Sequence, residues 1–183
     1  MNENTINFDQ LNSLLNSVKL DDVNAESNEN QNNSLPDGYY LCEVAKAELT
    51  TSKSSNKPMA AFRFKAVEDG IGTVIENGFT KKVNIEHTAN RVLFKYYVLG
   101  TEEDVKKFVS DMLKFEEPGN EGVPLLDKEV FLDGEVLGDA IEALEGARLY
   151  VQVSNTVKKS TGEAQTWYSL ISWKRAKGLE LPL

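Results

Sequence analysis

The sequence predicts a mainly β domain with helical segments inserted between its third and fourth strands. Alternating side chains in 38–49 and 61–65 indicate two strands, because successive strand residues point to opposite faces. The same period of two returns in 148–153 and 163–174, whereas apolar residues between these pairs recur at helical intervals of three and four. A length of 183 residues and a hydrophobic content of 40% are enough for one core.

A polar loop joins the first two strands. Residues 50–58 are Thr-Thr-Ser-Lys-Ser-Ser-Asn-Lys-Pro, too long and too polar for a two-residue turn. Hydroxyl and ammonium groups suit a surface loop that holds anions, and the alternative is an ordinary hairpin loop. Lys53 and Lys57 are therefore candidate phosphate contacts.

Further strand material follows in residues 74–85, interrupted by an Asn-Gly pair typical of tight hairpin turns. Phe79 lies close to Lys81 and Lys82 in this segment. An aromatic ring can stack on a base while a cation meets phosphate, so the group is a candidate for binding single-stranded nucleic acid. The alternative is a buried Phe79 beside two solvated lysines.

The region 88–145 is predicted to be mainly helical. Apolar residues at helical spacing indicate a helix over 88–99. A second helix begins after Thr101, which forms an N-cap signal with Asp104. A third helix is expected over 133–144.

The last strand pair is expected to form a hairpin whose tip, residues 156–163, again carries lysines and hydroxyl groups. Lys158 and Lys159 are candidate phosphate contacts there. At least one or two aromatic side chains on the arms are expected to face away from the core, where they would be free to stack on bases. These aromatic residues are Tyr150, Trp167, Tyr168 and Trp173. Residues 178–183 form a short tail without a clear pattern.

Charge is segregated along the chain, although a net charge of −9 taken as a whole argues against a nucleic-acid partner. Residues 101–145 carry fourteen acidic and four basic groups, and residues 1–34 carry six and one. The strand-bearing blocks are basic, with nine basic and seven acidic groups in 35–100 and six and two in 146–183. A local electropositive face is compatible with this distribution. The alternative is that the charges only keep solvated surfaces soluble.

Residues 1–34 are predicted to form a flexible, acidic and Asn-rich leader. Within it, 6–20 place apolar side chains on one side of a short amphipathic helix. The following residues, 21–34, have too few apolar side chains to offset the entropy lost on ordering and are expected to be a linker. The helix has three possible uses, which are docking on its own domain, pairing with another copy and binding in a partner's groove.

The sequence predicts no catalytic site, cofactor or metal. The single histidine, His87, has no second histidine, cysteine or serine motif nearby, and the single cysteine, Cys42, is expected to be a buried apolar residue. Phosphate-binding loops, nucleophile elbows, HExxH and CxxC motifs are absent from the sequence. We therefore do not expect an enzyme.

The sequence also favours a cytoplasmic protein. No apolar run approaches membrane-spanning length, and the first residues, MNENTINF, lack the basic start and apolar core of a signal peptide. One cysteine cannot form an internal disulfide, so a reducing compartment is the default. No membrane partner is expected.

Three motifs carry a family resemblance: GYY at 38–40, SKSSNKPM at 52–59 and FRFK at 62–65. They resemble a family of small bacteriophage proteins from replication and recombination cassettes, long described only as a domain of unknown function. The resemblance covers residues 35–177 and is specific within 38–65. It implies a single-stranded DNA-binding protein with a five-stranded oligonucleotide-binding barrel, whose helices lie between strands three and four.

Such a barrel binds single strands across its open face and between the loops that join strands one to two and four to five. Here those loops are 50–58 and 156–163. Cations would follow the phosphates while aromatic rings stack on bases with little sequence preference. The candidate nucleic-acid-binding residues are Lys53, Lys57, Arg63, Lys65, Phe79, Lys81, Lys82, Tyr150, Lys158, Lys159, Trp167 and Trp173. The expected partner is single-stranded DNA in the host bacterial cytoplasm, with replication or recombination proteins, or self-association through the leader helix, as further possibilities.

Two other functions remain open at this point. The protein would be an interaction module or inhibitor if its leader helix or the acidic segment 101–145 bound another protein, because acidic surfaces can mimic DNA. It would be a metal-dependent nuclease if several carboxylates converged on one pocket.

Overall fold

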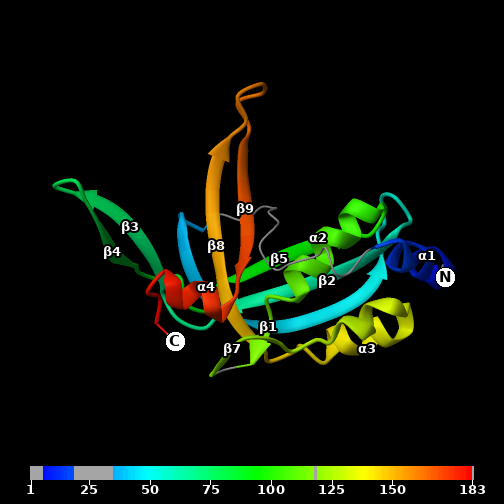
Figure 1. The fold of residues 1–183 in the computed structure, drawn as a ribbon. Coiled ribbons are helices and arrows are strands. Elements are labelled where there is room, and N and C mark those ends of the chain that lie inside the picture. The colour runs from blue at the N-terminus through cyan, green and yellow to red at the C-terminus, as the bar shows by residue number, and fades with distance from the viewer. Residues whose placement is uncertain (1–5, 19–34, 118, 183) are drawn as a thin grey trace.

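The chain folds around an antiparallel β-sheet with helices packed on one side (Figure 1). The computed structural model describes residues 6–18, 35–117 and 119–182. The strands are β1 (Gly38–Thr51), β2 (Pro58–Ala66), β3 (Gly70–Glu76), β4 (Phe79–Ile85), β5 (Val92–Val98), β6 (Glu116–Glu117), β7 (Asn120–Pro124), β8 (Arg148–Val157) and β9 (Ala164–Ile171). The helices are α1 (Phe8–Ser17), α2 (Glu102–Met112), the short 3-10 helix η2 (Lys128–Leu132), α3 (Gly134–Glu142) and α4 (Trp173–Gly178). The predicted mainly β class is confirmed.

β1 is the strand to which the rest of the main sheet is attached. It pairs with β2, β8 and β3, while β5 adjoins β2, β4 adjoins β3 and β9 adjoins β8. A bulge between Val44 and Lys46 bends β1 and increases its twist. The resulting seven-stranded sheet is not closed into a barrel, because β5 and β9 do not pair.

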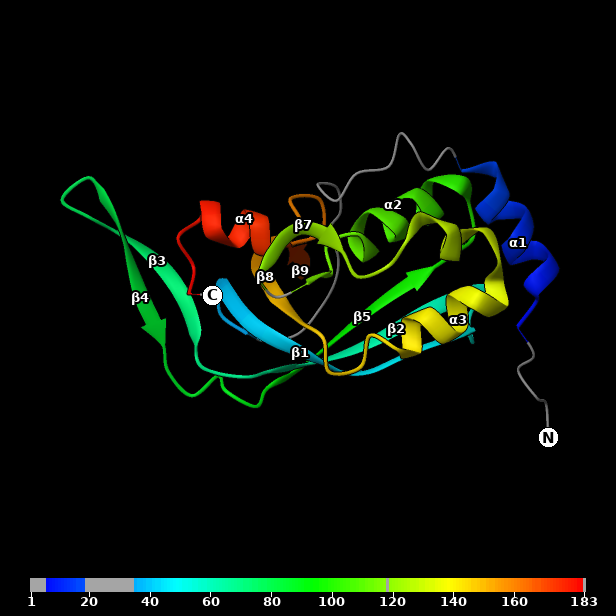
Figure 2. The same cartoon turned by 60° about the horizontal axis from the view of Figure 1, so that its bottom comes forward.

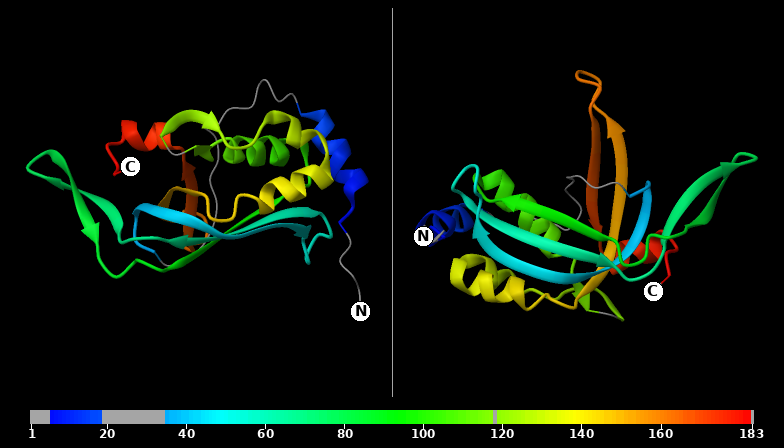
Figure 3. Two further views of the ribbon diagram at one scale, coloured as in Figure 1. Left: turned by 90° about the horizontal axis from the view of Figure 1, so that it is seen from below. Right: turned by 180° about the vertical axis from the view of Figure 1, so that it is seen from behind.

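Helices α1, α2 and α3 lie on the same side of β1, β2 and β5 (Figure 2). Inward-facing Phe62, Phe64 and Leu93 pack there in one core with Phe108 of α2, and all four are at most 1% exposed. Thr101 caps α2 as predicted, since its hydroxyl accepts a hydrogen bond from the backbone N–H of Asp104. The other side of these three strands carries no helix among the described residues (Figure 3).

The leader helix α1 is docked on its own domain. Leu11 and Leu15 are fully buried. Asn12 Oδ1 accepts a hydrogen bond of 2.6 Å from the backbone N–H of Gly134 at the start of α3. Of the three uses considered for this helix, docking within the chain is the one observed. The predicted linker, 21–34, lies outside the described residues.

The prediction of a helix over 88–99 is wrong, because residues 92–98 form strand β5. Leu93, Lys95 and Tyr97 alternate with Phe94, Tyr96 and Val98, and only the first three are buried. Residues 116–124 add the small hairpin of β6 and β7. The region 88–145 is therefore mixed rather than mainly helical.

Two hairpins extend from the body of the protein, as Figure 1 and the rear view of Figure 3 show. One is formed by β3 and β4, which turn at Asn77 and Gly78 with positive φ angles of 53° and 80°. These angles match a tight hairpin turn and explain the Asn-Gly pair. The other hairpin is formed by β8 and β9 and ends at residues 158–163.

A second, smaller core lies around α4. The strand expected over 163–174 ends at Ile171, and Ser172 caps α4 by accepting a hydrogen bond from the backbone N–H of Arg175. The ring of Trp173 meets the ring of Tyr150 edge-on at 5.9 Å between centroids. The Tyr150 hydroxyl donates to the carbonyl of Pro182 at 2.8 Å, so the end of the chain packs against β8.

A buried polar network connects α2 to β5 and β9. The fully buried Asp111 carboxylate accepts hydrogen bonds from Lys114 Nζ at 2.7 Å and from the Tyr97 hydroxyl at 2.6 Å, and its Oδ2 lies 3.2 Å from Lys95 Nζ. Lys95 Nζ also donates to the carbonyl of Tyr168 on β9 at 2.6 Å. Burying charges is costly unless they are paired and hydrogen-bonded, and this network meets that requirement.

Removing the carboxylate should destabilise the fold strongly. Asp111→Ala leaves the Lys95 and Lys114 ammonium groups buried without this partner, so we expect a loss of about 3–5 kcal/mol in the free energy of unfolding. Urea denaturation monitored by circular dichroism measures this loss. The matched control on the same helix is Glu103→Ala, which removes an exposed ion pair with Lys107 and should have little effect. Equal losses in the two variants would contradict the assigned role of the network.

Buried phenols should make the protein sensitive to alkali. Burial raises the pKa of Tyr40 and of Tyr150 to about 12. Burial and the charge of Asp111 raise the pKa of Tyr97 well above its ordinary value. Because the folded-state values are raised, these groups contribute fully to stability below about pH 10, and their contribution declines as the pH rises through 12.

Tyr150→Phe tests this dependence, since phenylalanine keeps the ring and cannot ionise. We expect the variant to be less stable than the wild type at pH 8, because the hydrogen bond to Pro182 is lost. The difference in the free energy of unfolding should shrink between pH 10 and 11.5. A difference that stays constant over this range in urea titrations would contradict the raised pKa of Tyr150.

Candidate nucleic-acid interface

The uncovered side of β1, β2 and β5 brings aromatic and basic side chains together. Register places Arg63 opposite Phe94 and Ala61 opposite Tyr96 on the β2–β5 ladder. On the β1–β2 ladder, Lys46 of β1 lies opposite the same Arg63. Ala61, Arg63, Phe94 and Tyr96 point away from the helices, because their neighbours in β2 and β5 fill the core. Lys46 is exposed directly after the bulge of β1 and lies beside them. We call these five residues the β2–β5 face.

Two exposed rings dominate this face. Phe94 is 39% exposed and Tyr96 is 56% exposed, and their rings are nearly parallel, at 4°, with centroids 6.4 Å apart. Because Ala61 is small, it leaves space beside Tyr96, and the five residues border a shallow hollow of about 240 Å³. Exposed aromatic rings beside cations are the arrangement that stacks bases and contacts phosphates in proteins that bind single strands.

The charges around the face are mixed. Lys46 Nζ forms an ion pair of 2.5 Å with Glu48, and this hydrogen bond and charge raise the pKa of Lys46. Arg63 and Lys65 are exposed on β2. A phosphate on this face would therefore compete with Glu48 for Lys46 and would meet Arg63 directly.

The two lysine-bearing loops lie apart. Lys53 is exposed in the loop between β1 and β2. The side chain of Lys57 instead packs against Gly100, where a Cβ added to the glycine would lie 2.7 Å from Lys57 Cδ. Lys158 and Lys159 are exposed at the tip of the β8–β9 hairpin. In the rear view of Figure 3, this tip stands well away from the β1–β2 loop. The predicted lysines thus form separate groups at two ends of the sheet.

The β3–β4 hairpin carries three further candidates. Phe79 is 78% exposed, and Lys81 forms an exposed ion pair of 3.3 Å with Glu76. Lys82 Nζ donates to two backbone carbonyls in the segment after α4, at 2.7 and 2.5 Å. Lys82 therefore anchors the end of the chain, while Phe79 and Lys81 remain accessible.

The aromatic candidates of the last hairpin differ in accessibility. Tyr150 is 1% exposed and Trp173 is 8% exposed, because α4 covers that side of β8. Neither ring can stack on a base in this structure, so we leave both out of the candidate interface. Trp167 is half-buried, and its Nε1 donates to the hydroxyl of Thr156 at 2.9 Å.

Sequence reasoning missed the central residues of the face. Phe94 and Tyr96 were not among the expected site residues, since 88–99 was assigned to a helix. Lys46, on the correctly predicted first strand, was not among them either. The signal that would have found the rings is the strict alternation along 92–98, in which both aromatics fall on the same side.

Other reactive groups offer little chemistry. Cys42 is fully buried, and burial raises the pKa of its thiol well above the ordinary value, so it stays protonated at neutral pH. In the part of the chain that the structure describes, no three His, Cys, Asp or Glu side chains are grouped so that they could hold a metal ion.

Comparison of the chain with protein-family models gave no match, and comparison with curated proteins gave none. The family resemblance of residues 38–65 therefore stays a prediction. None of the described helices has the length and apolar character needed to cross a membrane.

Proposed function

We propose that this protein binds single-stranded DNA with little sequence preference, as a phage-type protein that coats or protects the strand during replication or recombination in the bacterial cytoplasm. The observation that carries the proposal is the parallel pair of exposed rings, Phe94 and Tyr96, beside Arg63 on a sheet face that none of the described helices covers. Every base has a flat face that can stack on such rings, and the cations meet the phosphates.

The strand order supports an oligonucleotide-binding topology. In that fold, five strands follow one another with a helical segment between the third and fourth. β1, β2, β5, β8 and β9 have this order, α2 and α3 lie between β5 and β8, and the β3–β4 hairpin is an insertion after the second strand. In a closed barrel, β5 and β9 would pair through backbone hydrogen bonds. Here they are connected by the hydrogen bond that Lys95 Nζ donates to the carbonyl of Tyr168.

In this topology, the β2–β5 face is the expected binding surface. Ligands of oligonucleotide-binding folds lie across strands two and three and reach the loops between strands one and two and between strands four and five. In this chain, those strands are β2 and β5, and those loops carry Lys53 with Lys57 and Lys158 with Lys159. We assign the rings to base stacking, Arg63 and Lys65 to nearby phosphates, and the loop lysines to more distant ones.

Fluorescence anisotropy of a labelled oligo-dT of about 30 nucleotides, titrated with the full chain at several salt concentrations, tests the proposal. We expect saturable binding that weakens as salt rises, because phosphate contacts release counterions. A duplex of the same length should bind less tightly. Absence of binding at low salt would overturn the proposal.

Removing either ring should weaken binding without unfolding the protein. Phe94→Ala and Tyr96→Ala should each cost about 1–3 kcal/mol in binding free energy, the usual contribution of one base stack. Leu132→Ala is the matched control, since Leu132 is 49% exposed on η2, away from the face. The same anisotropy titration provides the comparison.

Arg63→Gln should act differently, by reducing the salt dependence of binding by roughly one phosphate contact. If both ring variants bound oligo-dT as tightly as the wild type while remaining folded, the rings would not be the stacking platform. An unchanged salt slope in Arg63→Gln would exclude its phosphate contact.

A protein-interaction module is the second candidate, and one observation favours it. Val136 and Leu132 are 51% and 49% exposed and lie on α3 and η2, two neighbouring elements that also carry acidic residues. The leader helix gives this alternative no support, because its apolar residues Leu11 and Leu15 are buried within the chain. Capture of a protein partner that charge reversal in 101–145 abolishes, but that substitution of Lys53, Lys57, Lys158 and Lys159 leaves intact, would favour this candidate.

A further inference from the structure

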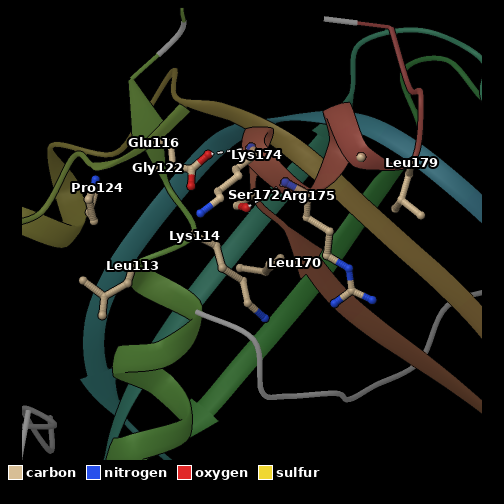
Figure 4. Close-up of a pocket in the computed structure, with 11 residues that line it drawn as sticks. Leu113, Lys114, Glu116, Gly122, Pro124, Leu170, Ser172, Lys174, Arg175 and Leu179 are labelled. Carbon is tan, nitrogen blue, oxygen red and sulfur yellow. Dashed lines mark hydrogen bonds between the residues drawn. The ribbon is translucent and has the colours of Figure 1, made fainter. Parts of the chain in front are cut away.

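A cleft of about 710 Å³ lies on the helix-bearing side of the protein, between the end of α2, the β6–β7 hairpin and α4 (Figure 4). Its walls come from three segments distant in sequence, which are the end of α2 with β6, the strand β7, and the end of β9 with α4. The cleft is separate from the β2–β5 face, and none of the residues proposed above to bind DNA lines it.

Basic side chains predominate among the charged residues of the cleft. Lys114 reaches it from the end of α2, while Lys174 and Arg175 reach it from α4 (Figure 4). Among the residues that the structure describes, the one carboxylate in the lining is that of Glu116. Lys114 is only 4% exposed, so its charge is poorly screened by water. Its ion pair with Asp111 fixes the ammonium in place.

Glu116 acts mainly as a positioning group. Its Oε2 accepts a hydrogen bond of 2.9 Å from the backbone N–H of Lys174, and this bond attaches the start of α4 to β6. The attachment sets where Lys174 and Arg175 project. Lys114 and Arg175 extend into the same part of the cleft, whereas Lys174 extends toward Glu116 (Figure 4). Lys114 is paired with Asp111 and Glu116 is engaged by the backbone, so the guanidinium of Arg175 is the cation without a carboxylate partner in this lining as described. Such a lining favours an anion with several oxygen atoms, because a guanidinium and ammonium groups together match phosphate.

The size and the apolar part of the cleft define the rest of the ligand. A volume of about 710 Å³ is within the usual range of small-molecule sites. Leu113, Leu170 and Leu179 supply apolar wall beside the cations. A bare phosphate would leave this wall unused, whereas a nucleoside attached to the phosphate would cover it.

We propose that this cleft binds a nucleoside monophosphate group, with the phosphate against Lys114 and Arg175 and the nucleoside against the leucines. The group has two possible sources, a free mononucleotide and the 5′-phosphate end of a single strand. The free-nucleotide form is independent of the proposed DNA-binding function. The strand-end form rests on that function and adds a second contact on the opposite side of the sheet.

Isothermal titration calorimetry of the full chain with dTMP, thymidine and inorganic phosphate, in a phosphate-free buffer, tests the first source. We expect saturable binding of dTMP and weaker binding of thymidine and of phosphate alone. Arg175→Gln should weaken dTMP binding by about tenfold or more, the loss expected for one charge-assisted hydrogen bond. Lys177→Gln is the matched control, because Lys177 lies on the same helix, pairs with Glu121 and does not line the cleft.

The second source is tested by comparing 5′-phosphorylated and 5′-hydroxyl oligo-dT of equal length. A preference for the phosphorylated strand that disappears in Arg175→Gln, but persists in Phe94→Ala, supports the strand end as ligand. If the proposed DNA-binding function fails, the 5′-phosphorylated and 5′-hydroxyl strands should bind equally weakly, while dTMP still binds to the cleft. If dTMP is not bound and the wild type shows no preference for the phosphorylated strand, the proposal for the cleft is overturned. It is also overturned if Arg175→Gln binds dTMP with the affinity of the wild type, provided that its thermal unfolding curve shows the variant to be folded.

Discussion

The structure depends on one buried carboxylate. Asp111 lies at the centre of a network that contains Lys95, Tyr97 and Lys114, and through Lys95 this network reaches the backbone of β9. A charged lysine side chain can be buried in a core only when it is paired with an anion. Because Lys95 points inward, its chain neighbours Phe94 and Tyr96 must point outward. The same interaction that fixes β5 in the core therefore presents the two rings to solvent.

The distribution of charge follows the two sides of the sheet. Most acidic residues of segment 101–145 belong to α2, α3 and the connections around them, which lie on the helix-bearing side. Arg63 and Lys65 lie on the other side, with the two rings. A protein with a net charge of −9 can thus keep a face suited to an anionic strand, because short-range contacts outweigh distant charges that salt screens.

Much of the fold follows from local pattern. The N-cap at Thr101, the turn at Asn77 and the helix α3 were all predicted, since each rests on residues within a few positions of one another. β5 was missed because an inward Lys95 resembles an outward polar residue, and its partner Asp111 lies sixteen positions away on another element. Sequence pattern does not show such a partner.

The candidate site was predictable to a smaller extent. Arg63 and Lys65 were identified correctly as exposed strand residues. Tyr150 and Trp173 were expected to be available for stacking, but α4 covers that side of β8, and its start had been assigned to the strand over 163–174. Whether an aromatic residue on a strand is open to solvent depends on what packs over it, and strand periodicity alone specifies only which side it takes.

The most direct test of the central claim is to map where a single strand binds. Amide chemical shifts of the isotope-labelled full chain, followed during titration with oligo-dT, report the contacts residue by residue. We expect the largest changes on β2 and β5 around Arg63, Phe94 and Tyr96. Changes confined to α2, η2 and α3, or none at all, would contradict it.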